Sequence, residues 1–289
     1  MSQTMERAPV GAPARATTYA TLLVHAQAGA GSKHRVQVAA ALAQRLGARL
    51  VGLGAEGFSP IPTPDPFTGY ASGEWTALVL EQIAKDLKAA EATFQRDAAG
   101  ADVEWRSIQE FPARALVRTA RVADLVVVSP RARADAAHSA DPADVVMSAG
   151  RPVLLVPEPS GRLEASCVLV AWKNTRECRR AVADALPFLL QAKDVIVQAV
   201  CRPEEVEAAE AETADVVANL VRHGAPARAL VTCVQPESVV DELMRVADLN
   251  GADLIVAGAY GHSRLREWVF GGVTDELMHR PGCYVLMSH

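Results

Sequence analysis

The residues best suited to chemistry lie near the end of the chain, in the stretch 253–277. A short apolar run at 254–257 is bounded by turn residues and predicts a buried strand. Glycines follow it, and the segment 272–279 is typical of a helix; the glycines are Gly258, Gly261, Gly271 and Gly272. This arrangement suits phosphate, because glycines let the backbone approach an anion and a helix N-terminus points free N–H groups at it.

Several residues of this loop are candidate ligands. Gly258 and Gly261 would admit the backbone to the phosphates, and Thr274 would offer a hydroxyl to the terminal phosphates. Arg264 would neutralise phosphate charge, since a guanidinium suits phosphate oxygens. Each feature also has a structural interpretation, in which the glycines form a turn, Thr274 starts a helix, and the arginine is solvated, as arginines usually are.

The extended spacing is more specific than a bare pair of glycines. It runs Gly258-x2-Gly261-x9-Gly271, followed by Gly272, Val273 and Thr274. This pattern resembles the nucleotide-binding motif of the universal stress protein family, whose form ends in glycine and then serine or threonine. Gly272 stands where the hydroxyl residue is expected. The resemblance implies ATP or ADP as cofactor, with or without magnesium. The site residues that we expect are Gly258, Gly261, His262, Arg264, Gly271, Gly272, Val273, Thr274 and Ala171.

One further position departs from the family's pattern. The first strand of the family usually ends in an acidic residue beside the adenosine. Here Lys173 stands at that position in the second half of the chain, and Gln27 stands there in the first half. Loss of the carboxylate puts part of the nucleoside contact in doubt. Lys173 either meets a phosphate or points to solvent, and the second is favoured because an ammonium resists burial without a partner.

Composition excludes several classes of protein. The chain has 289 residues, a formal net charge of −5 and 22% charged residues, so nothing in it indicates nucleic acid as a partner. Its apolar runs fall short of the roughly 18 residues that a membrane helix needs. The segment 1–18 lacks the apolar region of a signal peptide and is interpreted as a disordered tail. We therefore expect a cytoplasmic protein without a membrane partner.

The cysteines agree with that location. All five lie in the second half, their number is odd, and their spacings fit no metal pattern; they are Cys167, Cys178, Cys201, Cys233 and Cys283. Most lie in apolar runs. Buried, reduced thiols without bound metal are the expected state.

The order of predicted elements occurs twice along the chain. The sequence DLVVVSP at position 124 matches DLIVAGA at position 253, and Arg-Pro at 151 matches Arg-Pro at 280, so both pairs are 129 residues apart. A shared offset at two landmarks indicates an internal duplication. Strands alternating with helices predict an α/β fold with two doubly wound, five-stranded parallel sheets. The family resemblance implies that the fold is Rossmann-like and similar to that of the adenine nucleotide alpha hydrolases.

With this duplication, the resemblance extends over nearly the whole chain as two fused universal stress protein domains. We expect a first domain over 19–157, a linker over 158–166 and a second domain over 167–289. Members of the family pair through their last strands. The resemblance therefore implies an intrachain pseudo-dimer with 153–156 beside 284–287, and a homodimer of chains is a further expectation. Any protein partner is unknown.

Local signals predict how individual elements begin. Ser32 is a candidate N-cap for a helix over 33–46, and Ser238 for one over 238–249. Asp141 with Pro142 predicts the start of a short helix. A segment rich in proline and glycine, 57–73, is interpreted as a long irregular loop ahead of a helix over 74–99. Helices are also expected over 112–123, 175–190 and 203–223.

The first half lacks the glycine loop. Ser129 and Pro130 stand at the equivalent position, and no glycine lies between Ser129 and Ala149. β-Carbons and a proline there would block close approach of the backbone, so this half is predicted to be degenerate as a nucleotide site. Arg131, Arg133 and His138 would bind another anion or form a solvated loop, and the solvated loop is favoured.

Three functions remain open from the sequence. The first is a nucleotide-binding stress-response protein with its site in the second half. The second is a signalling or interaction module that has lost nucleotide binding, which Gly272 and Lys173 favour. The third is a hydrolase of adenine nucleotides, whose nearest candidate acids, Glu267 and Asp275, are better explained as surface and helix-start residues. The sequence contains no recognisable catalytic constellation, so an enzyme is not favoured.

Overall fold

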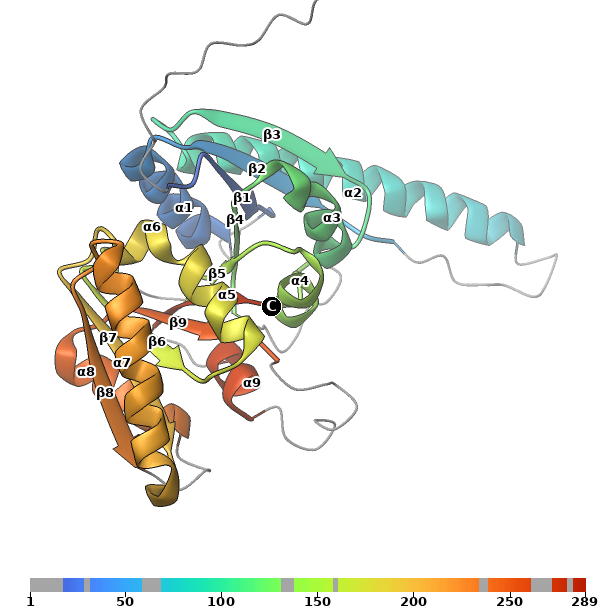
Figure 1. Cartoon of the computed structure of the whole chain (residues 1–289). Helices are drawn as coiled ribbons and strands as arrows, with labels where there is room; N and C mark the ends of the chain where they lie inside the picture. The colour runs from blue at the N-terminus through green and yellow to red at the C-terminus, as the bar shows by residue number, and fades with distance from the viewer. Residues whose placement is uncertain are drawn as a thin grey trace, which may run out of the picture.

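The computed structural model describes residues 18–28, 32–58, 69–130, 138–157, 161–233, 239–260, 272–279 and 283–289. These residues form one ten-stranded sheet covered by helices (Figure 1). The strands are β1 Thr21–His25, β2 Arg49–Ala55, β3 Val103–Ile108, β4 Leu125–Val128, β5 Val153–Leu155, β6 Cys167–Trp172, β7 Asp194–Cys201, β8 Ala227–Cys233, β9 Leu254–Gly258 and β10 Tyr284–Ser288. The α-helices are α1 Lys33–Leu46, α2 Gly69–Asp97, α3 Pro112–Thr119, α4 Pro142–Ser148, α5 Arg176–Asp184, α6 Leu186–Leu189, α7 Val206–Arg222, α8 Val239–Asn250 and α9 Gly272–His279.

The sheet consists of two five-stranded parallel units. Its order is β3-β2-β1-β4-β5-β10-β9-β6-β7-β8, so each unit reverses direction beside its first strand. The units meet where β5 pairs antiparallel with β10, with Leu154 opposite Leu286. The predicted α/β fold and the predicted pairing of the last strands are therefore confirmed.

Apolar runs explain why these segments lie inside the sheet. Both faces of a parallel sheet are covered, so its strands are apolar throughout rather than alternating with polar residues. All four residues of β4, LVVV, are buried. One face of the sheet packs with buried residues of α1, α2, α5 and α7, and the other with buried residues of α3, α4, α8 and α9.

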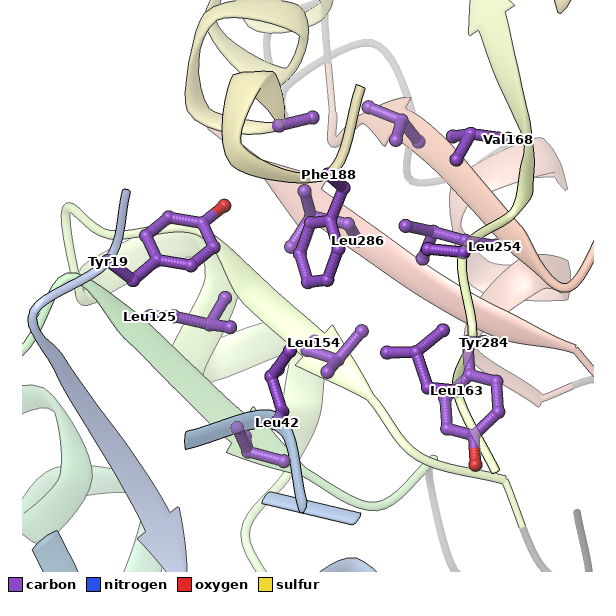
Figure 2. Packing of buried hydrophobic residues seen from close by; sticks show 14 of the residues in the cluster. Tyr19, Leu42, Leu125, Leu154, Leu163, Val168, Phe188, Leu254, Tyr284 and Leu286 are labelled. Carbon is purple, nitrogen blue, oxygen red and sulfur yellow. The ribbon is translucent and has the colours of Figure 1, made fainter. Parts of the chain in front are cut away.

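The two halves share one core at their junction. Leu154 and Leu286 are fully buried there, and Figure 2 shows them beside Leu125 and Phe188. The ring centroids of Tyr19 and Phe188 lie 5.8 Å apart in an edge-on arrangement, which joins a residue before β1 to α6. The Tyr19 hydroxyl donates to the Asp184 carbonyl, and burial raises the pKa of Tyr19 far above its usual value.

Residues of the expected linker also pack in this core. Leu163 and Ala165 are buried, and Arg45 of α1 donates to the Leu163 carbonyl at 2.8 Å. The Tyr284 hydroxyl donates to the Gly161 carbonyl. The segment 161–166 therefore contacts both halves of the chain.

The duplication is visible in matching hydrogen bonds. Asp124, just before β4, accepts the backbone N–H groups of residues 20 and 21 at 2.8 and 3.0 Å. Asp253, just before β9, accepts those of residues 164 and 165 at 2.7 and 2.9 Å. Each carboxylate thus fixes the segment that leads into the first strand of its own half. Ala165 adopts a left-handed φ of 50° at this point.

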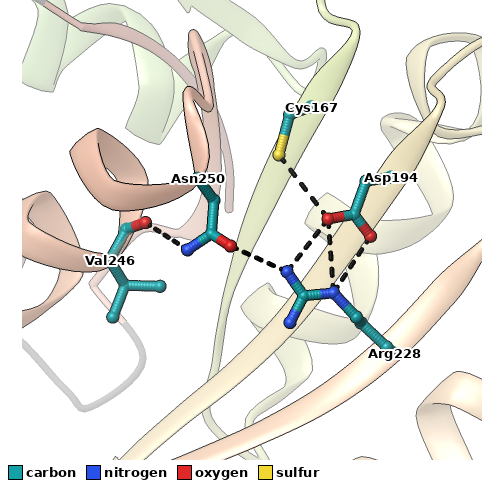
Figure 3. A network of polar contacts seen from close by, with 5 residues as sticks. All are labelled: Cys167, Asp194, Arg228, Val246 and Asn250. Carbon is teal, nitrogen blue, oxygen red and sulfur yellow. Dashed lines mark hydrogen bonds and ion pairs between the residues drawn. The ribbon is translucent and has the colours of Figure 1, made fainter.

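A polar network holds the amino ends of the outer strands in the second half. Arg228 of β8 forms an ion pair with Asp194 of β7 at 3.0 Å and donates to Asn250 of α8 at 2.9 Å (Figure 3). Asn250 in turn donates to the Val246 carbonyl at 2.7 Å. β8 is an edge strand, so this network fixes one end of an element that has a strand on one side only.

Several element boundaries differ from the sequence-based predictions. α2 begins at Gly69, inside the segment expected to be an irregular loop, because a helix of 29 residues tolerates the roughly 1 kcal/mol cost of an internal glycine. The helix expected over 112–123 ends as a 3₁₀ turn after Thr119. The one expected over 175–190 divides at Ala185, two residues before Pro187, which cannot donate within a helix. The one expected over 203–223 starts as a 3₁₀ turn.

The helix starts also have mixed outcomes. Asp141 caps α4 as predicted, accepting the Ala143 N–H at 2.9 Å. Ser32 occupies the N-cap position of α1 but does not cap it, because its hydroxyl donates to the Gln27 carbonyl at 2.8 Å. Ser238 lies outside the described residues. Among the helices that the structure describes, none combines the length and apolar character needed to span a membrane.

Candidate functional site

The candidate site lies at the carboxyl ends of β6 and β9. These strands pair in parallel, with Ala171 opposite Ala257, and they are the point where the strand order of the second half reverses. Loops on either side of such a reversal leave the sheet in opposite directions and open a crevice, where doubly wound proteins bind ligands. Of the predicted site residues, Ala171 and Gly258 lie at this point.

Gly258 is required here by helix packing. A β-carbon on Gly258 would lie 2.5 Å from the backbone nitrogen of Cys178, in the first turn of α5. Thr175 caps that helix by accepting the Cys178 N–H at 3.2 Å. The glycine therefore lets a helix N-terminus approach the end of β9, a contact that is independent of any ligand.

A buried thiol joins the same helix to Ala171. The Cys178 sulfur donates to the Ala171 carbonyl at 3.3 Å, and burial raises the pKa of this thiol. At the end of β6, the indole Nε1 of Trp172 is buried and has no hydrogen-bond partner among the described residues. A buried donor of this kind needs a partner such as a water or a ligand.

Tyr260 connects β9 to the start of α9. Its backbone N–H donates to the Thr274 hydroxyl at 3.4 Å, and its own hydroxyl contacts the Met278 sulfur at 3.9 Å. Its φ of 55° is left-handed, which is uncommon for a residue other than glycine. Sequence reasoning missed Tyr260, although its place between Gly258 and Gly261 was a possible signal of a constrained turn.

The N-terminus of α9 is open. Gly272 and Val273 are exposed, and a β-carbon on Gly272 would meet no atom within 4 Å among the described residues. The first N–H groups of a helix have no partner within that helix. The structure thus brings Thr274 to the end of β9 through Tyr260 and leaves the helix start beside it accessible.

The charged residues around β6 are largely solvated or paired. Lys173 is exposed, as expected. Glu177 is buried in the first turn of α5; burial raises its pKa, but a hydrogen bond to its own backbone and the Arg176 guanidinium 2.9 Å away lower it below the ordinary value. A carboxylate at this helix start adds negative charge beside the crevice.

Four of the expected ligands lie outside the described residues: Gly261, His262, Arg264 and Gly271. Glu267, the candidate acid, lies there as well. Among the residues described, no group of three His, Cys, Asp or Glu side chains could hold a metal ion.

The equivalent point of the first half is filled by an arginine. His25 and Ala171 occupy equivalent positions in β1 and β6, and Arg35 and Cys178 are each the third residue of the helix that follows. Arg35 is buried and donates from Nε to the His25 carbonyl at 2.7 Å. It also donates to the hydroxyl of Ser129, the counterpart of Gly258. A guanidinium therefore occupies the point of strand reversal.

Other titratable groups of the first half lie at the carboxyl ends of β1 and β2. His25 is buried, and burial together with the Arg35 charge holds its pKa well below the ordinary value. His138 contacts Glu56, which follows β2 and is buried. Arg131 and Arg133 lie outside the described residues. The first half thus has a guanidinium and the His25 imidazole where the second half has Cys178 and Ala171.

Comparison with known proteins gives the same fold. Residues 167–289 match the model of the universal stress protein family. A universal stress protein from Archaeoglobus fulgidus DSM 4304 superposes with a TM-score of 0.63 at 13% identity, covering 93% of this chain and 95% of that one. A putative universal stress protein from Pseudomonas aeruginosa UCBPP-PA14 gives a TM-score of 0.53 at 16% identity, covering 93% and 92%.

A shorter structure is also similar to part of the chain. It is a universal stress protein in complex with cAMP, 26% identical, covering 48% of this chain and 98% of that one with a TM-score of 0.33. At that score the likeness carries no conclusion about the ligand of this chain. A search of the curated proteins found no match.

Proposed function

We propose that this chain, which has the universal stress protein fold throughout and a universal stress protein domain over 167–289, binds one adenine nucleotide in its second half. The ligand is ATP or ADP, with or without magnesium, and the role is that of a cytosolic stress-response protein rather than an enzyme. The site is the crevice between the ends of β6 and β9 and the N-terminus of α9. Its residues are Ala171, Gly258, Gly261, His262, Arg264, Gly271, Gly272, Val273 and Thr274.

The single observation that carries the proposal is the junction of β9 with α9. The Tyr260 N–H bonds the Thr274 hydroxyl, so an open helix N-terminus lies beside the reversal point of the sheet. Helix N-termini favour phosphate through their free N–H groups and their dipole. The buried indole N–H of Trp172 adds a donor at the end of β6 that lacks a partner in the described part of the chain.

A stoichiometry of one follows from the asymmetry between the halves. In the first half, the Arg35 side chain occupies the reversal point of the sheet and donates to the Ser129 hydroxyl. In the second half, the equivalent residues are Cys178 and Gly258, whose backbones approach each other closely. Pro130 next to Ser129 also lacks the N–H donor that a phosphate loop needs. The first half is thus proposed to hold no nucleotide.

Calorimetric titration of the full chain with ATP and ADP tests the proposal. One site per chain is expected, and Thr274→Val should weaken it, because the variant loses the hydroxyl that holds the Tyr260 N–H. Thr213→Val is a matched control in α7, where the hydroxyl bonds carbonyls of its own helix. Two equivalent sites would contradict the degenerate first half.

A second candidate, a signalling or interaction module without nucleotide, is favoured by the packing around Gly258. The close approach of α5 explains this glycine without any ligand. Absence of binding at millimolar nucleotide, in protein that is folded by circular dichroism, would support this function and reject the first. Mass spectrometry of freshly purified protein for carried-over nucleotide gives an independent readout.

A further inference from the structure

Two cysteines lie side by side at the carboxyl ends of β7 and β8. Cys201 is the last residue of β7, Cys233 is the last residue of β8, and the parallel register pairs them directly. Neighbouring strands are about 4.8 Å apart. Disulfides join residues whose Cα atoms are roughly 4.4–6.8 Å apart, so the pair lies within that range.

Both side chains point to the same face of the sheet. Side chains alternate along a strand, and Val197 and Val231, which precede the cysteines by an even number of residues, pack in the core beneath α7. Gln198 and Thr232 point to the other face, where they bond each other at 3.0 Å. Cys201 and Cys233 therefore share the α7 side of the sheet, on neighbouring strands.

The other cysteines have different surroundings. Cys167, Cys178 and Cys283 are buried, whereas Cys201 is partly exposed and Cys233 is exposed. The buried thiols contact the Asp194 carboxylate and the carbonyls of Ala171 and Asp253. Cys201 and Cys233 thus combine a thiol neighbour with access to solvent.

We propose that Cys201 and Cys233 form a dithiol that peroxide converts reversibly to an interstrand disulfide. The exposed Cys233, as thiolate, attacks one peroxide oxygen and becomes a sulfenic acid while water leaves. The Cys201 thiolate then attacks that sulfur, the S–S bond forms, and a second water leaves. Two thiols and one hydrogen peroxide give one disulfide and two waters, so the sulfurs lose the two electrons that reduce the peroxide.

The surroundings make this a slow sensor and a poor metal site. Burial raises the pKa of the Cys201 thiol, and Cys233, Glu205 and Glu204 raise it further. Thiolate is the reactive form, so the raised pKa slows the second step, in which Cys201 attacks the sulfenic acid. A metal site would need more ligands than two thiols, and the described residues hold no group of three suitable side chains.

The disulfide would complete the attachment of an edge strand. The ion pair between Arg228 and Asp194 already holds β8 to β7 at the amino ends (Figure 3). A bond between Cys201 and Cys233 would hold the same two strands at the opposite ends. We expect oxidation to raise the unfolding temperature and to slow hydrogen exchange in β8.

Peroxide treatment of the full-length protein tests the proposal. The intact mass should fall by two hydrogen atoms, peptide mapping should link Cys201 to Cys233, and dithiothreitol should restore the starting mass. Cys201→Ser and Cys233→Ser should each lose the linked peptide, and Cys283→Ser should keep it. Circular dichroism confirms that each variant is folded.

A trivalent arsenical gives a second readout without oxidation. Phenylarsine oxide bridges two adjacent thiols, so native protein should take up one equivalent and Cys201→Ser should take up none that resists a monothiol competitor. Independent oxidation of the two sulfurs, a link between other cysteines, or an intermolecular dimer through Cys233 would each overturn the proposal. So would failure of the arsenical to bridge the pair.

Discussion

At the scale of single residues, Gly258 and Ser129 occupy equivalent positions in the two halves but make different contacts. Gly258 lets the backbone of α5 approach β9, whereas Ser129 in the first half meets the long side chain of Arg35. The sequence predicted Gly258 as a site residue from its spacing. It could not predict the contact with Cys178, which joins residues 80 positions apart, or the Arg35 side chain that fills the first half.

The first prediction concerns this close approach. Gly258→Ala should destabilise the protein by about 1–3 kcal/mol, because the new β-carbon collides with the backbone of Cys178 and α5 must move. Gly272→Ala is the matched control, since its β-carbon meets open space among the described residues; it should change stability by no more than about 0.5 kcal/mol. Urea unfolding measures both, and equal effects would contradict the packing described here.

The second prediction restores the missing hydroxyl of the phosphate loop. Gly272→Ser should tighten nucleotide binding by up to about tenfold, because one added hydrogen bond contributes on the order of 1 kcal/mol. A β-carbon at Gly272 would meet no atom within 4 Å in the described part of the chain, so a serine has room there. The same holds for Gly161, and Gly161→Ser serves as control. Calorimetry decides the matter, and unchanged affinity would remove Gly272 from the site.

The third prediction concerns pH. Burial and the Arg35 charge hold the pKa of His25 below the value of about 6.5 that it has in the unfolded chain. Below pH ~6.5 the unfolded chain therefore binds a proton that the folded chain does not. The contribution of His25 to the free energy of unfolding is therefore complete above that pH. It is lost as the pH falls, by at most about 1.4 kcal/mol per pH unit. Between pH 7 and 5.5, His25→Gln should lose about 1 kcal/mol less than the wild type in urea unfolding.

At the scale of elements, periodicity and apolar runs identified the strands and most helices to within a few residues. α1 and α9 have the bounds that the sequence predicted. The errors arose where tertiary structure decides. α2 begins at Gly69 because a helix of 29 residues extends into the predicted loop. The Ser32 hydroxyl donates to the Gln27 carbonyl instead of capping α1. All of the predicted loop ligands remain predictions, and four of them, Gly261, His262, Arg264 and Gly271, lie outside the described residues.

The fourth prediction addresses the matching carboxylates. Asp253→Ala should cost about 1–3 kcal/mol, because two backbone N–H groups lose a charged acceptor, and Asp124→Ala should cost a similar amount. Asp253→Asn, which keeps an oxygen acceptor, should cost less. Chemical denaturation of the variants measures these differences. A neutral Asp253→Ala would mean that the segment before β6 is held by its packing alone.

At the scale of the whole molecule, the antiparallel pair β5–β10 makes one cooperative unit of two duplicated halves. Leu154 and Leu286 pair across the junction, and both are fully buried in a core that spans it (Figure 2). A core shared in this way cannot be exposed on one side without loss of packing on the other. The two halves should therefore unfold together.

The fifth prediction follows from that shared core. Leu286→Ala should destabilise the protein by about 2–5 kcal/mol through the cavity that it leaves. Leu154→Ala in the other half should have a similar effect. Fluorescence and far-ultraviolet circular dichroism should still report one coincident transition for both variants. Two separated transitions, with one unchanged by Leu286→Ala, would show that the halves unfold independently.

The covalent connection between the two halves, which pair through β5 and β10, also fixes their ratio. The partner of each last strand is tethered to it, so this pairing is intramolecular and does not weaken on dilution, unlike the pairing of separate subunits. The last strand of the first half, β5, is thus paired with the last strand of the second half of the same chain, and not with the β5 strand of another molecule. Every molecule therefore contains one half with Arg35 and Pro130 and one half with Cys178 and Ala259 at the equivalent positions.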